Sequence, residues 1–176
     1  FNAFQSFNYP PLATAGIHIK YDLDRIKRAD PRLPMHPHYA FDTNVIILTL
    51  FPGIQENIIR NALSTPGLKA VILKTYGSGN APQKPWFIKL LTEVTQRGIV
   101  IVNISQCPTG TVEMARYETG IHLLDAGVIS GYDATVECVL TKLMFLLGHD
   151  LTPQEIRNEM SRSLAGEITR PEMPTR

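Results

Sequence analysis

Three short runs of almost entirely apolar residues constrain the fold of this chain more than any other feature. They are NVIILTLF at 44–51, KAVILKTY at 69–76 and IVIVNIS at 99–105. Runs of this length, rich in β-branched side chains, are typical of strands that are buried on both faces. The sequence therefore predicts a parallel sheet that is covered by helices on both sides.

The two segments between these runs have helical spacing, over residues 54–64 and 85–98. The apolar positions at helical intervals are Ile54, Ile58, Ile59 and Leu63 in the first segment, and Ile88, Leu91 and Val94 in the second. Gly98 is expected just after the last turn of the second helix, where glycine is favoured. Because such crossovers are right-handed, the three strands should end at one edge of the sheet.

The C-terminal third is predicted to be mostly helical. We expect a broken helix, a short fourth strand, a central buried helix and a final helix, at residues 111–127, 128–130, 133–150 and 152–164. The final helix begins with the capping box Thr152 and Glu155, with Pro153 at its first position. The predicted fold class is therefore α/β, a three-layer Rossmann-like domain whose small parallel sheet has about four strands.

Residues 1–40 differ from the rest because prolines and a charged patch interrupt them. Such a segment favours extended conformations and makes a poor core. We interpret residues 1–40 as an interdomain linker, with AGIHIKYD (15–22) as an edge strand, and residues 41–176 as the folded domain. The start of the chain reads as mid-chain sequence, so we expect an N-terminal domain to be missing.

Composition excludes several kinds of partner. The net charge of the 176 residues is +1 and the basic residues are scattered, which argues against nucleic acid. No apolar run is long enough for a membrane span. The two cysteines have no spacing typical of a metal site or a disulfide framework, and their contexts fit reduced thiols in a cytoplasm. We expect no metal and no cofactor.

A glycine loop follows the second predicted strand. Gly77, Gly79 and Asn80 lie between that strand and the next helix, where a phosphate cradle could form. The loop lacks the lysine of a P-loop and the third glycine of a dinucleotide turn, and Pro82 has no amide hydrogen to offer. Two interpretations remain: a tight turn, or a turn that presents the Asn80 side chain to a polar ligand.

Few other residues suggest catalysis. The five histidines are dispersed, and no serine elbow is present. Cys107 follows the third strand, but without an identifiable histidine it is better explained as a structural or regulatory thiol. Glu137 in the apolar helix should be paired or face water, and Lys74 at the end of the second strand is a candidate partner. Tyr117 lies in the segment that follows the third strand.

The motifs together resemble a known family. YGSGNAP, RGIVIVNISQCPTG, AGVISGYDATVECVLTKLMFLL and IRNEMSRSLAGEIT occur in the order found in the C-terminal domain of bacterial type I, cytoplasmic L-asparaginase. The resemblance extends over the whole chain, including residues 1–40, which match the stretch that joins the two domains of that family.

The resemblance implies hydrolysis of L-asparagine to L-aspartate and ammonia, without a cofactor, in a homodimer or homotetramer. The family's nucleophilic threonine lies in an N-terminal Thr-Gly-Gly-Thr motif, and a second threonine in a Thr-Asp-Thr motif; neither motif occurs in this chain. The fragment alone should therefore be inactive. By the same resemblance, Asn80 and Tyr117 contact substrate across a dimer interface, and Gly77 and Gly79 shape the loop.

The resemblance also implies an allosteric effector site at Lys74, Cys107 and Glu137. Lys74 stands where the family has an arginine, and lysine cannot make the planar two-pronged contact with a carboxylate, which argues against allosteric activation here. Two alternatives remain open. One is the asparaginase-like subunit of a tRNA-dependent amidotransferase, and the other is a non-catalytic α/β binding or oligomerisation module.

Overall fold

The computed structural model describes residues 6–28, 30–115 and 118–169. The chain divides into two compact units, residues 1–39 and 40–176. The second unit contains the sheet and all five helices of the described residues.

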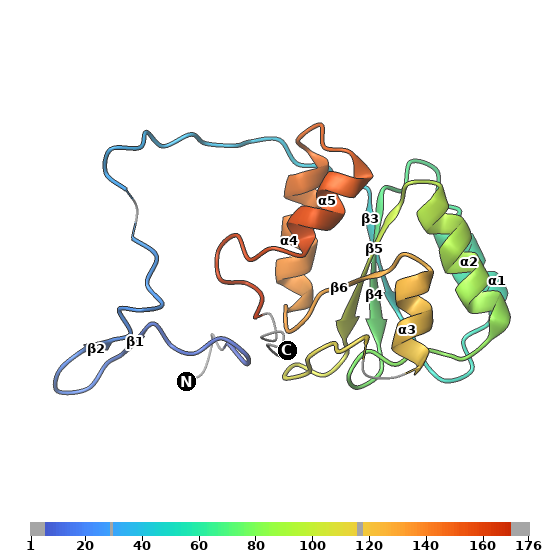
Figure 1. Cartoon of the computed structure of the whole chain (residues 1–176), viewed down its shortest axis with the longest axis horizontal. Coiled ribbons are helices and arrows are strands. Elements are labelled where there is room, and N and C mark those ends of the chain that lie inside the picture. The colour runs from blue at the N-terminus through green and yellow to red at the C-terminus, as the bar shows by residue number, and fades with distance from the viewer. Residues whose placement is uncertain (1–5, 29, 116–117, 170–176) are drawn as a thin grey trace, which may run out of the picture. The chain divides into compact units, whose positions relative to one another are not determined.

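The second unit is built on a four-stranded parallel sheet (Figure 1). Its strands lie in the order β3-β4-β5-β6, at Val45–Thr49, Ala70–Thr75, Val100–Ser105 and Ile129–Ser130. Val45 pairs with Ala70, and Ala70 with Val100, so the three long strands are in register from their first residues. The prediction of a parallel sheet of about four strands is confirmed.

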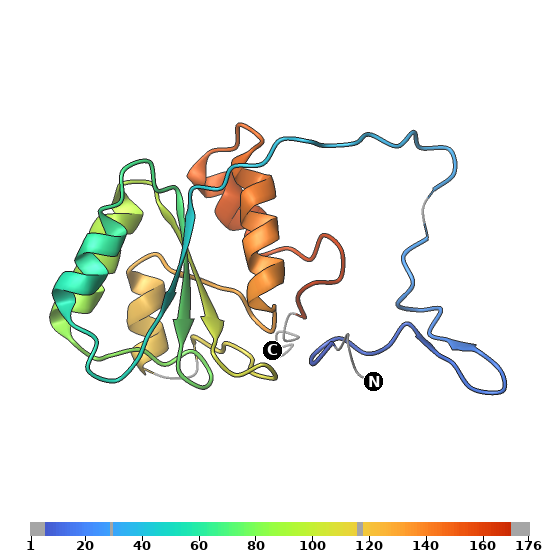
Figure 2. The ribbon, with the colours of Figure 1, turned by 180° about the vertical axis from the view of Figure 1, so that it is seen from behind.

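Helices cover both faces of this sheet, as predicted (Figure 2). One face carries α1, α2 and α3, at Glu56–Leu63, Pro85–Gln96 and Glu118–Asp125, and the other carries α4 and α5, at Val136–Leu147 and Pro153–Met160. Because each new strand is added at the same edge, right-handed crossovers place all three connecting helices on one face. The opposite face is covered only after β6 ends, when the chain returns through α4 and α5.

The side chains of the central strand alternate between two hydrophobic cores. Val71 and Leu73 pack toward α1 and α2, whereas Ala70 and Ile72 pack toward α4 and α5. All four are fully buried. Strands buried on both faces explain the continuous apolar runs in the sequence.

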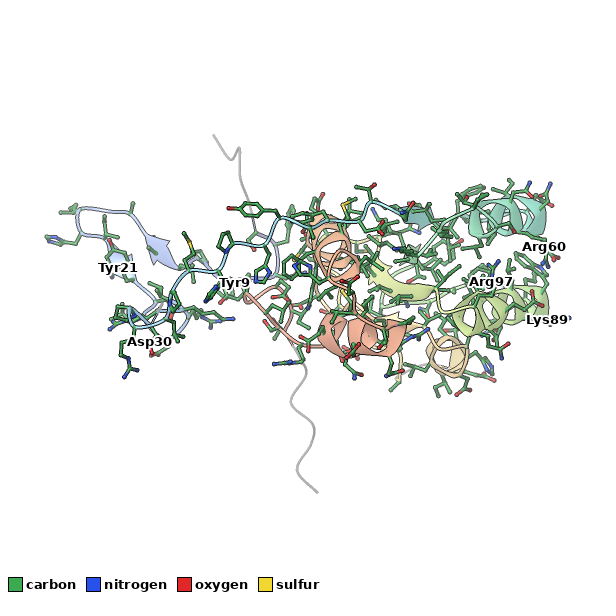
Figure 3. The ribbon with its side chains drawn as sticks, turned by 90° about the horizontal axis from the view of Figure 1, so that it is seen from above. Tyr9, Tyr21, Asp30, Arg60, Lys89 and Arg97 are labelled. Atoms are coloured by element: carbon green, nitrogen blue, oxygen red, sulfur yellow. The ribbon has the colours of Figure 1, made fainter. Side chains whose placement is uncertain are left out.

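The helices differ from expectation in detail. Ile58 shares the helical spacing of 54–64, yet it is 49% exposed, because it lies one residue off the stripe that contains Ile59 and Leu63. Helix α4 forms an outer layer with several half-buried apolar residues, so it is less enclosed than the central helix that was expected. Figure 3 shows Arg60 and Lys89 projecting from the outer sides of α1 and α2.

The final helix has the predicted start and an earlier end. The Thr152 hydroxyl accepts from the Glu155 amide, and the Glu155 carboxylate accepts from the Thr152 amide at 2.8 Å, so both halves of the capping box are present. Helix α5 ends at Met160 instead of 164.

A buried ion pair fixes the segment that follows α5. Lys142 of α4 lies 2.6 Å from Glu167, and the two side chains are 6% and 10% exposed. Burial alone would raise the pKa of Glu167, but the amides of Leu164 and Ala165 and the Lys142 ammonium together lower that pKa to about 2. The segment after α5 is therefore tied to α4 through a buried side chain of that helix.

The first unit contains one small hairpin within its described residues. Strands β1 (Ala13–Thr14) and β2 (Lys20–Tyr21) pair antiparallel, so the expected edge strand at 15–22 is a two-residue strand of a hairpin. Many apolar side chains here are exposed, including Ile17 at 99% and Met35 at 90%. Figure 3 labels Tyr9, Tyr21 and Asp30 in this unit.

Candidate functional site

The loop after β4 is a tight turn closed by its own backbone. The Tyr76 amide donates to the Asn80 carbonyl at 2.8 Å, and the Asn80 amide donates back to the Tyr76 carbonyl at 2.8 Å. Gly77 and Gly79 lie inside this turn with φ of +49° and +109°. The turn needs glycine most at residue 79, because that φ lies outside the left-handed region that other residues tolerate.

Backbone amides of this loop are directed at the loop itself. Gly79 and Asn80 both donate to the Tyr76 carbonyl, at 3.0 and 2.8 Å. A phosphate cradle depends on such amides pointing outward at the anion. These two amides are therefore engaged within the turn, and the Asn80 side chain stays a candidate for contact with a polar ligand.

Buried polar side chains of β4 and β5 hold the loop after β4 in place through hydrogen bonds. Asn103 of β5 donates through Nδ2 to the Gly79 carbonyl at 3.3 Å, and its Oδ1 accepts from the Thr75 hydroxyl at 2.7 Å. Both Asn103 and Thr75 are completely buried. Since buried polar groups are costly unless they are hydrogen-bonded, this pair fixes the position of the loop relative to the sheet.

A second set of polar contacts joins this loop to the one that follows β5. The Ser105 hydroxyl donates to the Gly77 carbonyl at 2.6 Å and accepts from the Cys107 amide at 2.9 Å. The Gln106 side-chain amide donates to the Leu50 carbonyl at 2.7 Å. The loops after β3, β4 and β5 are thus linked at the carboxyl edge of the sheet.

The side chain of Asn80 is half-buried and held by α3. The Thr119 hydroxyl, in the first turn of α3, donates to Asn80 Oδ1 at 2.7 Å. The carboxamide nitrogen of Asn80 lies on the side of the carboxamide opposite to Oδ1. An Asn side chain held in this way can donate hydrogen bonds to an acceptor oxygen of a ligand.

The proposed effector residues come from three elements at the same edge. Lys74 is the penultimate residue of β4, Cys107 is exposed after β5, and Glu137 is exposed in the first turn of α4. Among the described residues, the ion pairs include none between Lys74 and Glu137. Of the two alternatives predicted for Glu137, a paired side chain or one that faces water, the structure has the second, and Lys74 is not its partner. Tyr117 lies outside the described residues.

A cleft of about 610 Å³ lies beside the loop. Aromatic side chains of Phe51, Tyr76 and Trp86 line it together with Pro82 and Lys84. Its walls come from the segments after β3 and β4, so it opens at the same edge as Asn80.

Metal-binding clusters and membrane-spanning helices are both absent from the part of the chain that the structure describes. Its histidine, cysteine and carboxylate side chains form no group of three that could hold a metal ion. None of its helices has the length and apolarity needed to cross a membrane.

Comparison with known proteins identifies the family. Residues 44–160 match the family described as the glutaminase/asparaginase C-terminal domain. The chain belongs to this family. The matched residues run from the start of β3 to the end of α5, so they include the entire sheet and the loop that holds Asn80.

Individual relatives extend the match beyond that domain. The chain is 46% identical over 170 residues to L-asparaginase 1 of Escherichia coli K12, covering 96% of this chain and 49% of the relative. It is 38% identical over 177 residues to the human 60 kDa lysophospholipase, covering 100% of this chain and 30% of the relative. The chain therefore spans half or less of the length of these curated relatives.

A solved structure gives the same result for the fold. L-asparaginase I from Vibrio cholerae superposes with a TM-score of 0.88 at 41% identity, covering 96% of this chain and 50% of that one. The predicted resemblance to type I asparaginase and the predicted fold class are both confirmed.

Sequence reasoning missed most residues that position Asn80. They are Thr75, Asn103, Ser105, Gln106 and Thr119. A signal existed for Asn103, because it interrupts an otherwise apolar strand and a buried asparagine must find hydrogen-bond partners. Thr119 gave no such signal, since its contact joins residues that are 39 positions apart.

Proposed function

We propose that this chain is the C-terminal domain of a cytoplasmic L-asparaginase that hydrolyses L-asparagine to L-aspartate and ammonia. The observation that carries the proposal is the 46% identity to L-asparaginase 1 of Escherichia coli over 96% of the chain. The nucleophilic threonine would lie in an N-terminal catalytic domain, to which residues 1–40 connect. Neither threonine motif of the family occurs in the 176 residues.

The proposed role of this domain is to present Asn80 to a substrate held mainly by other parts of the enzyme. The strand order never reverses, so the sheet has no switch point of the kind at which open α/β domains enclose a ligand. An asparagine held by its turn and by Thr119 is suited to contribute one directed donor to a site completed by another subunit. In this proposal the protein works as a homodimer or homotetramer.

The donor would contribute by orientation and electrostatics. Its nitrogen would donate to an acceptor oxygen of bound L-asparagine, and its fixed position would avoid reorganisation during the reaction. The resemblance assigns Tyr117 to the substrate amino group. Lys74, Cys107 and Glu137 remain candidates for an effector site, although Lys74 argues against strong activation.

The test is ammonia release from L-asparagine by the protein expressed from the complete reading frame that encodes these residues. We expect release of ammonia in step with L-aspartate. Absence of both products, from a protein that is folded by circular dichroism, would exclude the proposal.

A mixing experiment tests the cross-subunit location. Asn80→Ala is co-expressed with a second variant in which the nucleophilic threonine is replaced, each with its own affinity tag. If Asn80 completes a neighbouring site, purified mixed oligomers recover part of the activity, because one of their sites is intact. If Asn80 acts within its own subunit, the mixed oligomers contain no intact site and recover nothing.

A further inference from the structure

We propose that Thr119 is a positioning residue that fixes the Asn80 side chain with its nitrogen toward the ligand. The inference rests on the proposed function and adds a residue to that site. It also specifies the ligand group: Asn80 would serve as a hydrogen-bond donor, and the ligand atom that it contacts would be an acceptor oxygen of a carboxylate or an amide carbonyl.

The first support is the contact between the two side chains. The Thr119 hydroxyl donates to Asn80 Oδ1 at 2.7 Å, and both residues are half-buried. The backbone of Asn80 is already fixed by its two hydrogen bonds with Tyr76. The remaining freedom of Asn80 is rotation of its side chain, and the Thr119 contact restricts that rotation.

The second support is that one segment, residues 112–114, fixes both partners. The Glu113 amide donates to the Ser78 carbonyl at 3.1 Å, and Val112 packs against Gly79, which ties this segment to the loop. On its other side the segment meets α3, where a Cβ on Gly120 would overlap the Met114 carbonyl. Residues 112–114 therefore contact both the loop that contains Asn80 and the helix that contains Thr119, and so set the distance between these two residues.

The consequence is a directed donor. With Oδ1 turned toward Thr119, the NH₂ group lies on the opposite side of the carboxamide, where its N–H groups can donate to a ligand. Without the hydroxyl, the carboxamide could rotate by 180° and turn its oxygen toward the ligand's own oxygen. Two acceptors facing each other form no hydrogen bond, so part of the contribution of Asn80 would be lost.

The kinetic test uses the protein from the complete reading frame. Thr119→Val removes the hydroxyl and keeps the shape, and Thr119→Ser keeps the hydroxyl. Thr141→Val is the matched control, because Thr141 is an exposed helical threonine whose hydroxyl donates to the Glu137 carbonyl of its own helix. Since a neutral hydrogen bond is worth a factor of about three to ten, Thr119→Val should lower kcat/KM by about that factor.

The other variants should behave differently. Thr119→Ser should recover at least half of the wild-type value, and Thr141→Val should leave it unchanged. In an Asn80→Ala background, Thr119→Val should cause no further loss, because the group that it positions is gone. Equal kinetics for Thr119→Val and Thr141→Val, or an undiminished loss in the Asn80→Ala background, would overturn the inference.

An independent readout does not depend on the substrate. In ¹H–¹⁵N spectra of the chain, the side-chain NH₂ pair of Asn80 should have shifts distinct from free asparagine, and these should move toward free values in Thr119→Val but not in Thr119→Ser. An inactive wild-type protein would exclude the proposed function, whereas unchanged Asn80 signals in Thr119→Val would exclude the positioning role.

Discussion

Replacing Gly79 by alanine should destabilise the loop that contains Asn80. The expected loss in the free energy of unfolding has two separate terms. Gly79 has φ of +109°, and a backbone held in such a sparsely populated region costs about 1–3 kcal/mol for a residue with a side chain. An added Cβ would also lie 2.8 Å from Val112 Cγ1, and overpacking of this kind costs about 1–3 kcal/mol. The expected loss in the free energy of unfolding is therefore about 2–6 kcal/mol.

Gly77→Ala is the matched control. Gly77 lies in the same turn, but its φ of +49° falls in the left-handed region and a Cβ there would meet no atom within 4 Å. The expected loss is about 1 kcal/mol. The difference between the two variants contains the contact with Val112 and the additional backbone cost of the larger φ at residue 79.

The assay is urea denaturation of the chain followed by the fluorescence of its single tryptophan. Trp86 packs against the core near this loop, with its ring centroid 5.7 Å from that of Phe87. A double variant, Gly79→Ala with Val112→Ala, should lose less stability than the sum of the single variants, because the smaller side chain relieves the overlap. Equal losses for Gly79→Ala and Gly77→Ala would refute the reasoning.

Three further predictions concern the rest of the chain. Glu167→Gln should lower the free energy of unfolding near pH 7 by about 3 kcal/mol, since the folded pKa is about 2 and that of the unfolded chain about 4.5. This contribution is present above pH 4.5 and is lost as the pH falls toward 2, so denaturation curves of the wild type should depend on pH in that window more than those of the variant. Thr152→Ala should cost about 1 kcal/mol by removing the cap of α5, and an unchanged urea midpoint would exclude that role of the capping box. Lys74→Arg in the protein from the complete reading frame should create or strengthen cooperativity toward L-asparagine, and hyperbolic curves in both forms would remove the effector-site hypothesis.

Much of the fold could be predicted because its strands are buried on both faces. The segments around Ile72 and Val102 are continuous apolar runs, and only a covered parallel sheet accommodates three of them. The start of α5 could also be predicted from the sequence, because a capping box is a local interaction between residues three positions apart. Features whose cause lies within a few residues were predicted well.

Features that depend on tertiary contacts were not predicted from the sequence. Helix α5 ends at Met160, and the segment that follows it is held by the ion pair between Lys142 and Glu167. These two residues are 25 positions apart in the sequence. Likewise, the loop after β4 suggested Asn80 as a candidate. Asn103 stood out as a polar residue in an apolar strand, but nothing local showed that its partner is the Gly79 carbonyl or that Thr119 contacts Asn80 from α3. The sequence suggested Asn80 as a candidate and did not indicate the residues that contact it or its loop.

The central claim is that Asn80 contributes a donor to the hydrolysis of L-asparagine. Its most direct test is kcat/KM for ammonia release by Asn80→Ala, expressed from the complete reading frame, beside the control Asn61→Ala on the exposed side of α1. Removing a preorganised donor from a reacting site typically costs about 100-fold or more, so we predict a loss of about that size for Asn80→Ala and none for Asn61→Ala, with equal urea midpoints. Indistinguishable kcat/KM values for the two variants would contradict the account.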